Sequence, residues 1–359
     1  MTDRRAGRIL LAGPLPPPIG GTTLLFERLV AAMQTREDIR TNVVDTSGVR
    51  GRGAMAAAAL AELRRELLES FSRCDVATLH VSTTGLHVMA PLMTSLARRH
   101  GVPLLVRKFG GGDFRGFGWL RRRVVVRALK EVDIYLAETR ALVEAGRSAG
   151  IRRVEWFPNC RPMARLPDDA DRGHESCRRF VFLGHLRRSK GVRELIAAGE
   201  ELGERATVDI YGLPGYDIDP SEFTRLSFVR YRGSVDPQDV NETLSQYDAL
   251  VLPSYMEGYP GVVIEAFAAG LPVIATLLPS LAEMVDDSCG VLVPPRDARA
   301  LAQAMNEFVG DSERYMRLRR GVRTRRVLFD ESRWHARFVE LVGELAAGRA
   351  DRDDDGGQP

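Results

Sequence analysis

Lysine, cysteine and long apolar runs are all scarce in this sequence. Only three of the 51 basic residues are lysine, and the four cysteines are scattered without a CxxC pair. Such spacing matches neither a zinc site nor a disulfide framework, so reduced thiols are expected. No stretch reaches the roughly 18 consecutive apolar residues of a spanning helix, and the first apolar run, Ile9–Ala12, is too short for a signal-peptide core. These absences predict a cytoplasmic protein.

The net charge of +3 conceals a difference between the two halves of the chain. Residues 1–165 carry 27 Lys and Arg against 15 Asp and Glu, whereas residues 166–359 carry 24 against 33. A basic half of this kind is consistent with binding to anionic lipid, phosphate or nucleic acid. The alternative is that it reflects only an arginine-rich composition. No nucleic-acid-binding motif accompanies the charge, so we expect no nucleic-acid partner.

Short apolar runs alternate with helical patterns in both halves. The predicted strands lie at 8–12, 42–45, 75–81, 103–106 and 133–137, and then at 180–183, 207–211, 228–232, 249–252, 273–275 and 290–293. Strands that alternate with helices imply right-handed crossovers and a mostly parallel sheet. The predicted fold class is therefore α/β, with two Rossmann-like domains.

The domain boundaries follow from changes in composition. We predict an N-terminal domain at 1–165, a polar linker at 166–178, a C-terminal domain at 179–328, a final helix at 329–347 and a disordered acidic tail at 348–359. Chains of 359 residues suit two domains, because a single core rarely grows beyond about 250–300 residues.

The segment from Leu252 to Ala275 is the most informative part of the sequence. It has the pattern of a strand, a glycine-bearing loop and a helix that starts near Gly261. A helix N-terminus favours a phosphate through its N–H groups and its dipole. Glu257 and Glu265 flank the loop, and carboxylates accept hydrogen bonds from sugar hydroxyls. This combination suits a nucleoside-diphosphate sugar; the alternative is an ordinary connection with two surface glutamates.

A second segment, 182–196, follows the first strand of the second half and opens a helix. Lys190 stands at the helix start, where an ammonium can reach a pyrophosphate as a point charge. Arg187 or Arg188 can clamp the same group bidentately. A basic loop alone is usually only solvated, but this one shares a domain with the two glutamates, and together they predict a donor-binding site.

These motifs resemble family 4 of the glycosyltransferases, the retaining enzymes also known as glycosyl transferases group 1. The seven residues between Glu257 and Glu265 match the E-x7-E signature, and Gly184 with Lys190-Gly191 matches the basic loop. Further matching segments lie at 18–21, 157–159 and 281–295. The resemblance implies a GT-B fold, in which two Rossmann-like domains face a central cleft and the last helix crosses back to the N-terminal domain.

The resemblance also implies roles for individual residues. Lys190, with Arg187 or Arg188, would bind the pyrophosphate of the donor, Glu257 would face the transferred sugar, and Glu265 would bind the ribose. Glu257, Lys190 and Arg187 are the expected catalytic residues. The other expected donor-binding residues are Gly184, Gly258, Gly261, Val262 and Val263, the last three through backbone amides. No metal and no cofactor are expected, since no DxD-type pair follows a nucleotide-binding strand.

Two positions depart from the family pattern. His185 stands where arginine usually follows the glycine, and Phe109 stands where the family tends to have histidine. The residues expected across the cleft from the donor are Gly20, Gly21, His80, Lys108, Phe109 and Gly110. His80 ends a predicted buried strand, so a structural and a functional role both remain open.

The acceptor is specified less closely than the donor. Residues 115–127 mix arginines with Phe117 and Trp119 in the half that handles the acceptor in this fold. We expect a saccharide or lipid-linked acceptor and peripheral contact with an anionic membrane; the alternative is a solvated helix that packs its apolar residues inward. The predicted function is a retaining glycosyltransferase of polysaccharide, glycolipid or other glycoconjugate biosynthesis. A non-catalytic nucleotide-sugar-binding protein and a GT-B-type epimerase are the alternatives.

Overall fold

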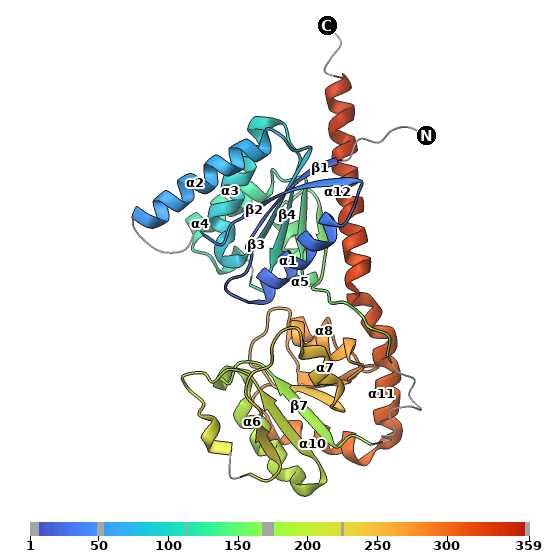
Figure 1. Cartoon of the computed structure of the whole chain (residues 1–359). Helices are drawn as coiled ribbons and strands as arrows, with labels where there is room; N and C mark the ends of the chain where they lie inside the picture. The colour runs from blue at the N-terminus through green and yellow to red at the C-terminus, as the bar shows by residue number, and fades with distance from the viewer. Residues whose placement is uncertain (1–6, 49–53, 113, 167–175, 224–225, 356–359) are drawn as a thin grey trace. The chain divides into compact units, whose positions relative to one another are not determined.

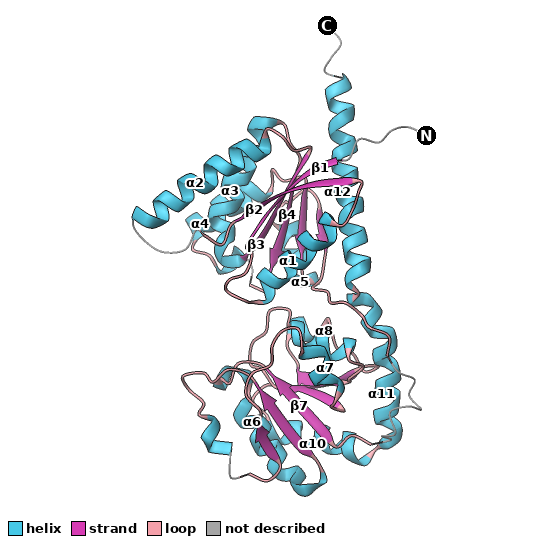
Figure 2. Ribbon diagram, in the orientation of Figure 1, coloured by secondary structure: helices cyan, strands magenta, loops and turns pink. Residues whose placement is uncertain are grey.

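The computed structural model describes residues 7–48, 54–112, 114–166, 176–223 and 226–355. The chain divides into two compact units, the first formed by Met1–Pro158 with Ser332–Pro359 and the second by Asn159–Glu331. Each unit holds one six-stranded sheet flanked by helices (Figure 1, Figure 2). The two Rossmann-like domains predicted from the sequence are therefore confirmed.

All strands of the first unit are parallel, in the order β2-β1-β3-β4-β5-β6. The strands are β1 (Gly7–Gly13), β2 (Ile39–Asp45), β3 (Val76–Ser82), β4 (Leu104–Phe109), β5 (Ile134–Ala137) and β6 (Val154–Trp156). The helices are α1 (Gly21–Gln34), α2 (Ala54–Phe71), α3 (Thr83–His100), α4 (Trp119–Leu129), α5 (Arg140–Ser148) and α12 (Glu331–Asp355). Helices α2, α3, α4 and α5 pack on one face of this sheet, whereas α1 and α12 lie on the other, where Phe26 and Phe338 contact His80 (Figure 1).

The second unit has the strand order β12-β11-β10-β7-β8-β9, again all parallel. Its strands are β7 (Arg179–Leu183), β8 (Thr207–Tyr211), β9 (Val229–Tyr231), β10 (Ala249–Leu252), β11 (Val273–Thr276) and β12 (Gly290–Val293). Its helices are α6 (Val192–Leu202), α7 (Val240–Ser245), α8 (Gly261–Ala268), α9 (Pro279–Ala282), α10 (Ala298–Gly310) and α11 (Ser312–Arg325). The strand order reverses between β7 and β10, and ligands of doubly wound sheets bind at such a reversal.

Central strands are buried on both faces in each sheet. Every residue of β4, β5, β10 and β11 is buried, as expected for a parallel sheet that helices cover on both sides. These are the continuous apolar runs that predicted the strands. The exception is β4, which carries Arg107 and Lys108 in its interior.

The last helix returns to the first unit. Trp334 packs edge-on against Trp156 and Phe157, with ring centroids 5.3 and 5.0 Å apart, and Phe338 and Leu341 are fully buried. Farther along α12, Arg349 donates a hydrogen bond of 2.8 Å to the carbonyl of Cys74.

Two predicted segments differ from the structure or fall outside it. The tail predicted to be disordered from residue 348 is helical as far as Asp355, because Ala346, Ala347 and Arg349 favour helix and Arg349 is anchored on the first unit. Residues 356–359 lie outside the described residues, as does most of the predicted linker, at 167–175.

Candidate functional site

The two motifs of the second half meet where its strand order reverses. The basic loop follows β7 and the glutamate-bearing loop follows β10, and these strands are paired in the sheet. Gly191 has φ +69°, and a Cβ on it would overlap the carbonyl of Pro253, so only glycine permits this approach. The amide of Tyr255 donates a 2.8 Å hydrogen bond to the carbonyl of Ser189. Backbone contacts therefore hold the two loops side by side.

The loop contact brings Lys190 and Glu257 together. The Lys190 Nζ lies 2.7 Å from Glu257 Oε1, and the same oxygen accepts a 2.7 Å hydrogen bond from Ser254 Oγ. The Glu257 side chain is 8% exposed and that of Lys190 is 27% exposed. A carboxylate this deeply buried requires a counter-charge, which Lys190 supplies. The ion pair joins residues that the sequence assigned to the pyrophosphate and to the transferred sugar.

The first turn of α8 lies directly after the loop that carries Glu257. Pro260 is its N-cap, and no side chain caps the helix. The Val263 amide bonds to the Pro260 carbonyl at 3.3 Å. Among the described residues, the amides of Gly261 and Val262 therefore have no hydrogen-bond partner, whereas Val263, also predicted to bind the diphosphate, is already engaged. Two amides and the helix dipole make this end suited to an anion.

Glu265 forms an ion pair that the sequence did not predict. The Arg161 Nε lies 2.7 Å from Glu265 Oε1, and their side chains are 12% and 23% exposed. The two residues are 104 positions apart. No local spacing predicts such a contact; the only signal in the sequence is a basic residue two positions after the matched segment 157–159.

The other basic-loop residues are solvent-facing. The Arg187 guanidinium lies 5.8 Å from the ring centroid of Tyr216, and the Arg188 amide donates a 3.0 Å hydrogen bond to Asp217 Oδ2. In the described part of the chain, neither guanidinium forms a hydrogen bond or ion pair with Lys190 or Glu257. Gly184 donates through its amide to the Tyr211 carbonyl, and His185 is exposed.

Three predicted site residues of the first unit lie in its interior. The ammonium of Lys108 donates to the carbonyls of Gly110 and Gly112, and Phe109 is buried against the guanidinium of Arg107. His80 packs between Phe26 and Phe338, and burial lowers its pKa well below the usual value. The side chains of His80, Lys108 and Phe109 are thus not presented to a ligand, because helices cover both faces of β3 and β4.

Gly20 and Gly21 instead line a cavity in the first unit, at the reversal between β1 and β3. Its volume is 690 Å³. The polar part of the lining is formed mainly by hydroxyl groups, and the apolar part by Val81, Val88 and Met89. The hydroxyls belong to Thr22, Thr23, Thr46, Ser47, Ser82 and Thr84. No lysine, arginine, aspartate or glutamate is among the described residues that line it, so the cavity suits a neutral, hydroxyl-rich ligand.

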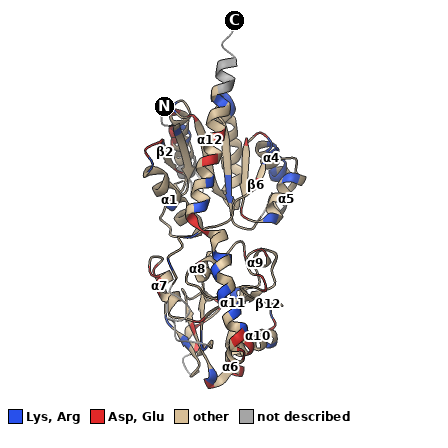
Figure 3. Cartoon of the chain, turned by 90° about the vertical axis from the view of Figure 1, so that its right-hand side faces the viewer, with Lys and Arg blue, Asp and Glu red and all other residues tan. Residues whose placement is uncertain are grey.

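Helix α4 is rich in basic residues (Figure 3), and apolar side chains next to them are exposed. Trp119 is 75% exposed and Leu120 is 59% exposed. The exposed basic residues of the helix and its C-cap are Arg121, Arg122, Arg123, Arg127 and Lys130. The alternative in which Trp119 packs inward is wrong. Within the described residues no helix is long and apolar enough to cross a bilayer.

Comparisons with known proteins agree with the motifs. Residues 177–311 match the family model of the glycosyl transferases group 1. The chain is 28% identical over 250 residues to glycogen synthase of Mycobacterium tuberculosis, covering 64% of this chain and 60% of that protein. It is 34% identical over 128 residues to the putative teichuronic acid biosynthesis glycosyltransferase TuaC of Bacillus subtilis, covering 36% and 32%. The predicted resemblance to group 1 is confirmed.

Solved structures show the same fold at low sequence identity. The Anabaena protein Alr3699/HepE in complex with UDP aligns with a TM-score of 0.74 at 17% identity, covering 94% of this chain and all of that one. The lipopolysaccharide outer core galactosyltransferase WaaB aligns with a TM-score of 0.66 at 16% identity. The predicted GT-B fold is therefore confirmed. The chain spans 60% of the length of the glycogen synthase that it matches.

Proposed function

We propose that the protein transfers a sugar from a nucleoside-diphosphate sugar to an acceptor hydroxyl with retention of configuration. The observation that carries the proposal is the Lys190–Glu257 ion pair, placed beside the uncapped first turn of α8. A donor needs a cation and amides for its diphosphate and carboxylates for its sugar hydroxyls. The curated relatives of matching sequence are glycosyltransferases, which supports the same reaction.

The mechanism follows from where charge develops. As the bond to the leaving diphosphate breaks, Lys190 and the amides of Gly261 and Val262 stabilise the negative charge on the phosphate, while Glu257 stabilises positive charge on the sugar. Retention requires attack from the face that the leaving group vacates. A phosphate oxygen then takes the acceptor proton, so no protein base is required. We expect turnover without a divalent metal, and activity that survives a chelator tests this.

The decisive experiment measures binding and turnover together. A panel of nucleoside diphosphates is screened by thermal shift against wild type, Lys190→Ala and Glu265→Ala, with Arg317→Gln on the exposed face of α11 as the control. A ligand at 100 times its Kd stabilises by about 2.7 kcal/mol. We expect one diphosphate to stabilise wild type and the control but neither site variant. The absence of any shift in wild type would overturn the proposal.

Turnover separates the transferase from its alternatives. A transferase releases nucleoside diphosphate in proportion to glycosylated acceptor. An epimerase forms no glycosidic bond to an acceptor, and a non-catalytic binding protein returns the nucleotide sugar intact. The anomeric configuration of the product, read by NMR, tests retention.

We further propose that the acceptor occupies the 690 Å³ cavity of the first unit. Its hydroxyl side chains can exchange hydrogen bonds with a saccharide, and its apolar wall can cover a sugar face. Thr84→Val should raise the acceptor KM without changing donor affinity. An unchanged acceptor KM would place the acceptor elsewhere.

A lipid-linked acceptor is consistent with peripheral membrane contact through α4. The arginines of α4 attract anionic headgroups, each by about 1 kcal/mol, and Trp119 suits the bilayer interface. We expect wild type to co-float with phosphatidylglycerol vesicles at low salt. The triple variant Arg121→Gln/Arg122→Gln/Arg123→Gln should bind roughly 100-fold more weakly, unlike Arg317→Gln/Arg320→Gln on α11. If wild type does not co-float with the vesicles, this contact is excluded, together with a peripheral location on the inner face of the membrane.

A further inference from the structure

Arg161 contacts both the first residue of α8 and Glu265, the candidate ribose-binding residue on that helix. Its Nε bonds to Glu265 Oε1 at 2.7 Å, and its Nη1 donates to the Cys160 carbonyl at 2.9 Å. A Cβ built on Gly261 would overlap the guanidinium around Nη2. Thus the guanidinium lies against the first residue of α8, with the Nη2 edge turned towards that helix end.

The position of Arg161 is set by backbone contacts rather than by chance packing. Its amide donates to the Phe329 carbonyl at 3.0 Å, and its carbonyl accepts from the Glu331 amide at 2.9 Å. The backbone of Arg161 is therefore held on both sides, and its side chain is only 12% exposed. Fixing an arginine in advance reduces the conformational entropy that ligand binding would cost.

The side-chain charges at this helix end are paired, but the positive end of the helix dipole has no anionic partner among the described residues. A cation near a helix N-terminus is unfavourable, since the dipole is positive there. Glu265 compensates Arg161, and Glu257 compensates Lys190, but the α8 N-terminus with its two unpaired amides has no anion of its own among the described residues. Nη2 likewise forms no hydrogen bond to a described residue. An oxyanion at this place satisfies all of these donors.

We propose that Arg161 is a donor-binding residue, which holds Glu265 through Nε and binds the diphosphate of the donor through Nη2. This inference rests on the proposed function, because it places the nucleotide at α8. It gives Glu265 a second role. Besides accepting from the ribose, the carboxylate orients the guanidinium that binds phosphate.

Gly261 offers a way to displace Arg161 without removing it. The overlapping atoms are the far end of a long side chain, so Gly261→Ala should push the guanidinium away from Glu265 while the backbone stays in place. Alanine favours helix more than glycine does, which offsets part of the cost of separating Arg161 from Glu265, and a thermal melt of the variant without ligand shows that it is folded. Loss of binding in Gly261→Ala would not then be a folding defect.

The test compares a nucleoside with its diphosphate, using uridine with UDP and guanosine with GDP. We measure both Kd values by titration for wild type, Arg161→Gln, Arg161→Lys, Gly261→Ala and the control Arg317→Gln. A charge-assisted hydrogen bond contributes about 1.5–3 kcal/mol, so the preference for diphosphate over nucleoside should fall roughly 10- to 100-fold in Arg161→Gln and Gly261→Ala. Arg161→Lys should recover part of it, and the control should match wild type.

The outcomes distinguish failure of the role given to Arg161 from failure of the proposed function. If Arg161→Gln weakens nucleoside and diphosphate equally, or weakens neither, Arg161 is structural and the inference is overturned, while the proposed function stands on the wild-type affinity. If wild type binds none of the diphosphates, the proposed function itself fails.

Discussion

Single buried charges shape the properties of this chain at the residue scale. Glu257 is 8% exposed, and its ionised form depends on one ammonium and one hydroxyl, from Lys190 and Ser254. Removing one partner of such a pair leaves an uncompensated charge in the interior, which costs more than the pair itself contributes. The ion pair of the proposed donor site therefore also contributes to the stability of the second unit.

We predict that Lys190→Ala lowers the free energy of unfolding of the second unit by about 1–3 kcal/mol at neutral pH. Glu257→Gln in the same chain removes the unpaired charge and should restore most of that loss. Denaturant unfolding of the two single variants and the double variant measures the coupling. Additive effects would contradict the prediction.

His80 makes the first unit sensitive to acid. Burial first, and then the nearby Arg107 charge, lower the pKa of His80 well below that of an exposed histidine. The unfolded chain therefore binds a proton below about pH 6.5 that the folded chain does not. Above that pH, the free energy of unfolding is not reduced by protonation of His80 in the unfolded chain. Below it, the free energy of unfolding falls by up to about 1.4 kcal/mol for each pH unit, as long as His80 stays neutral in the folded protein.

We predict that His80→Phe makes the first unit less sensitive to acid. Phenylalanine matches the aromatic neighbours of His80 and cannot take up a proton. Thermal melts of both proteins between pH 8 and pH 5 test this. A parallel decline in the melting temperatures of variant and wild type would show that other groups are responsible.

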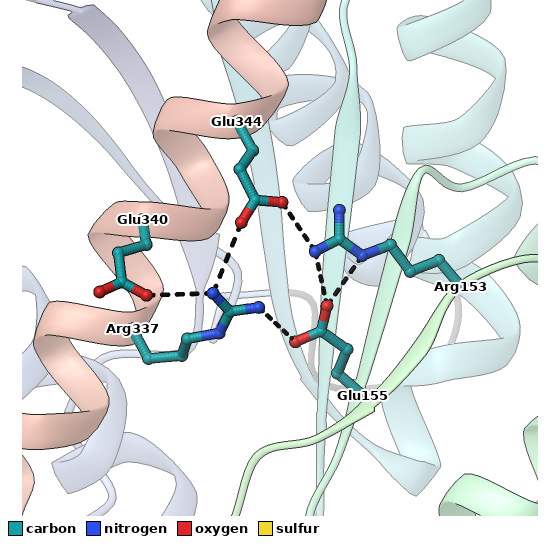
Figure 4. Close-up of polar contacts among 5 residues, drawn as sticks. All are labelled: Arg153, Glu155, Arg337, Glu340 and Glu344. Atoms are coloured by element: carbon teal, nitrogen blue, oxygen red, sulfur yellow. Dashed lines mark hydrogen bonds and ion pairs between the residues drawn. The ribbon is translucent and has the colours of Figure 1, made fainter.

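At the scale of elements, a network of charges ties α12 to β6 (Figure 4). Glu155 on β6 accepts from Arg337 at 2.9 Å, and Arg153 bridges Glu155 at 2.6 Å and Glu344 at 2.8 Å. Burial alone would raise the pKa of Glu155, but the hydrogen bonds from Arg337 and Arg153 outweigh it, and the pKa is lowered. This stabilisation is present above the ordinary glutamate pKa and is lost as the pH falls through the lowered one.

We predict that Glu155→Gln loosens the docking of α12 and destabilises the first unit by about 1–2 kcal/mol, since two guanidiniums lose a shared partner. Glu340→Gln is the matched control, because Glu340 pairs only with Arg337 and is 62% exposed. Surface pairs of that kind contribute less than about 1 kcal/mol. Hydrogen exchange in α12 measures the difference, and equal exchange in the two variants would contradict it.

At the scale of the whole molecule, one unit is continuous in sequence and the other is not. Asn159–Glu331 forms the second unit without interruption, whereas the first needs Ser332 onwards to complete it. Phe338, Leu341 and Val342 of α12 are buried in that unit. Deleting them removes roughly 2 kcal/mol of burial for each side chain.

We predict that a fragment of residues 159–331 folds by itself and keeps wild-type affinity for nucleoside diphosphate, because every proposed donor-binding residue lies within it. A fragment of residues 1–158 should be destabilised until a peptide of residues 332–355 is added. Calorimetry and circular dichroism of the fragments test both statements. A stable 1–158 fragment that ignores the peptide would refute the second.

Local patterns in the sequence determined where the elements and motifs lie. The predicted strands 207–211, 249–252 and 290–293 coincide with β8, β10 and β12, and α8 begins at Gly261 as expected. Strands buried on both faces are continuous apolar runs, and glycine and proline mark their ends, so these features depend on neighbouring residues alone. The E-x7-E spacing predicted the resemblance to the glycosyl transferases group 1 for the same reason.

Tertiary structure alone decided which side chains meet. Arg161 reaches Glu265 across 104 positions, and Lys108 turns inward to the carbonyls of its own glycine loop. Neither contact can be predicted from the periodicity of the sequence, because the residues next to a charged side chain do not show which partner it will have. The sequence by itself determined the two Rossmann-like folds and the position of the predicted donor-binding motif. The partner of each buried charge depended on the path of the chain through space, because ion pairs form between residues that are close in the fold and distant in the sequence.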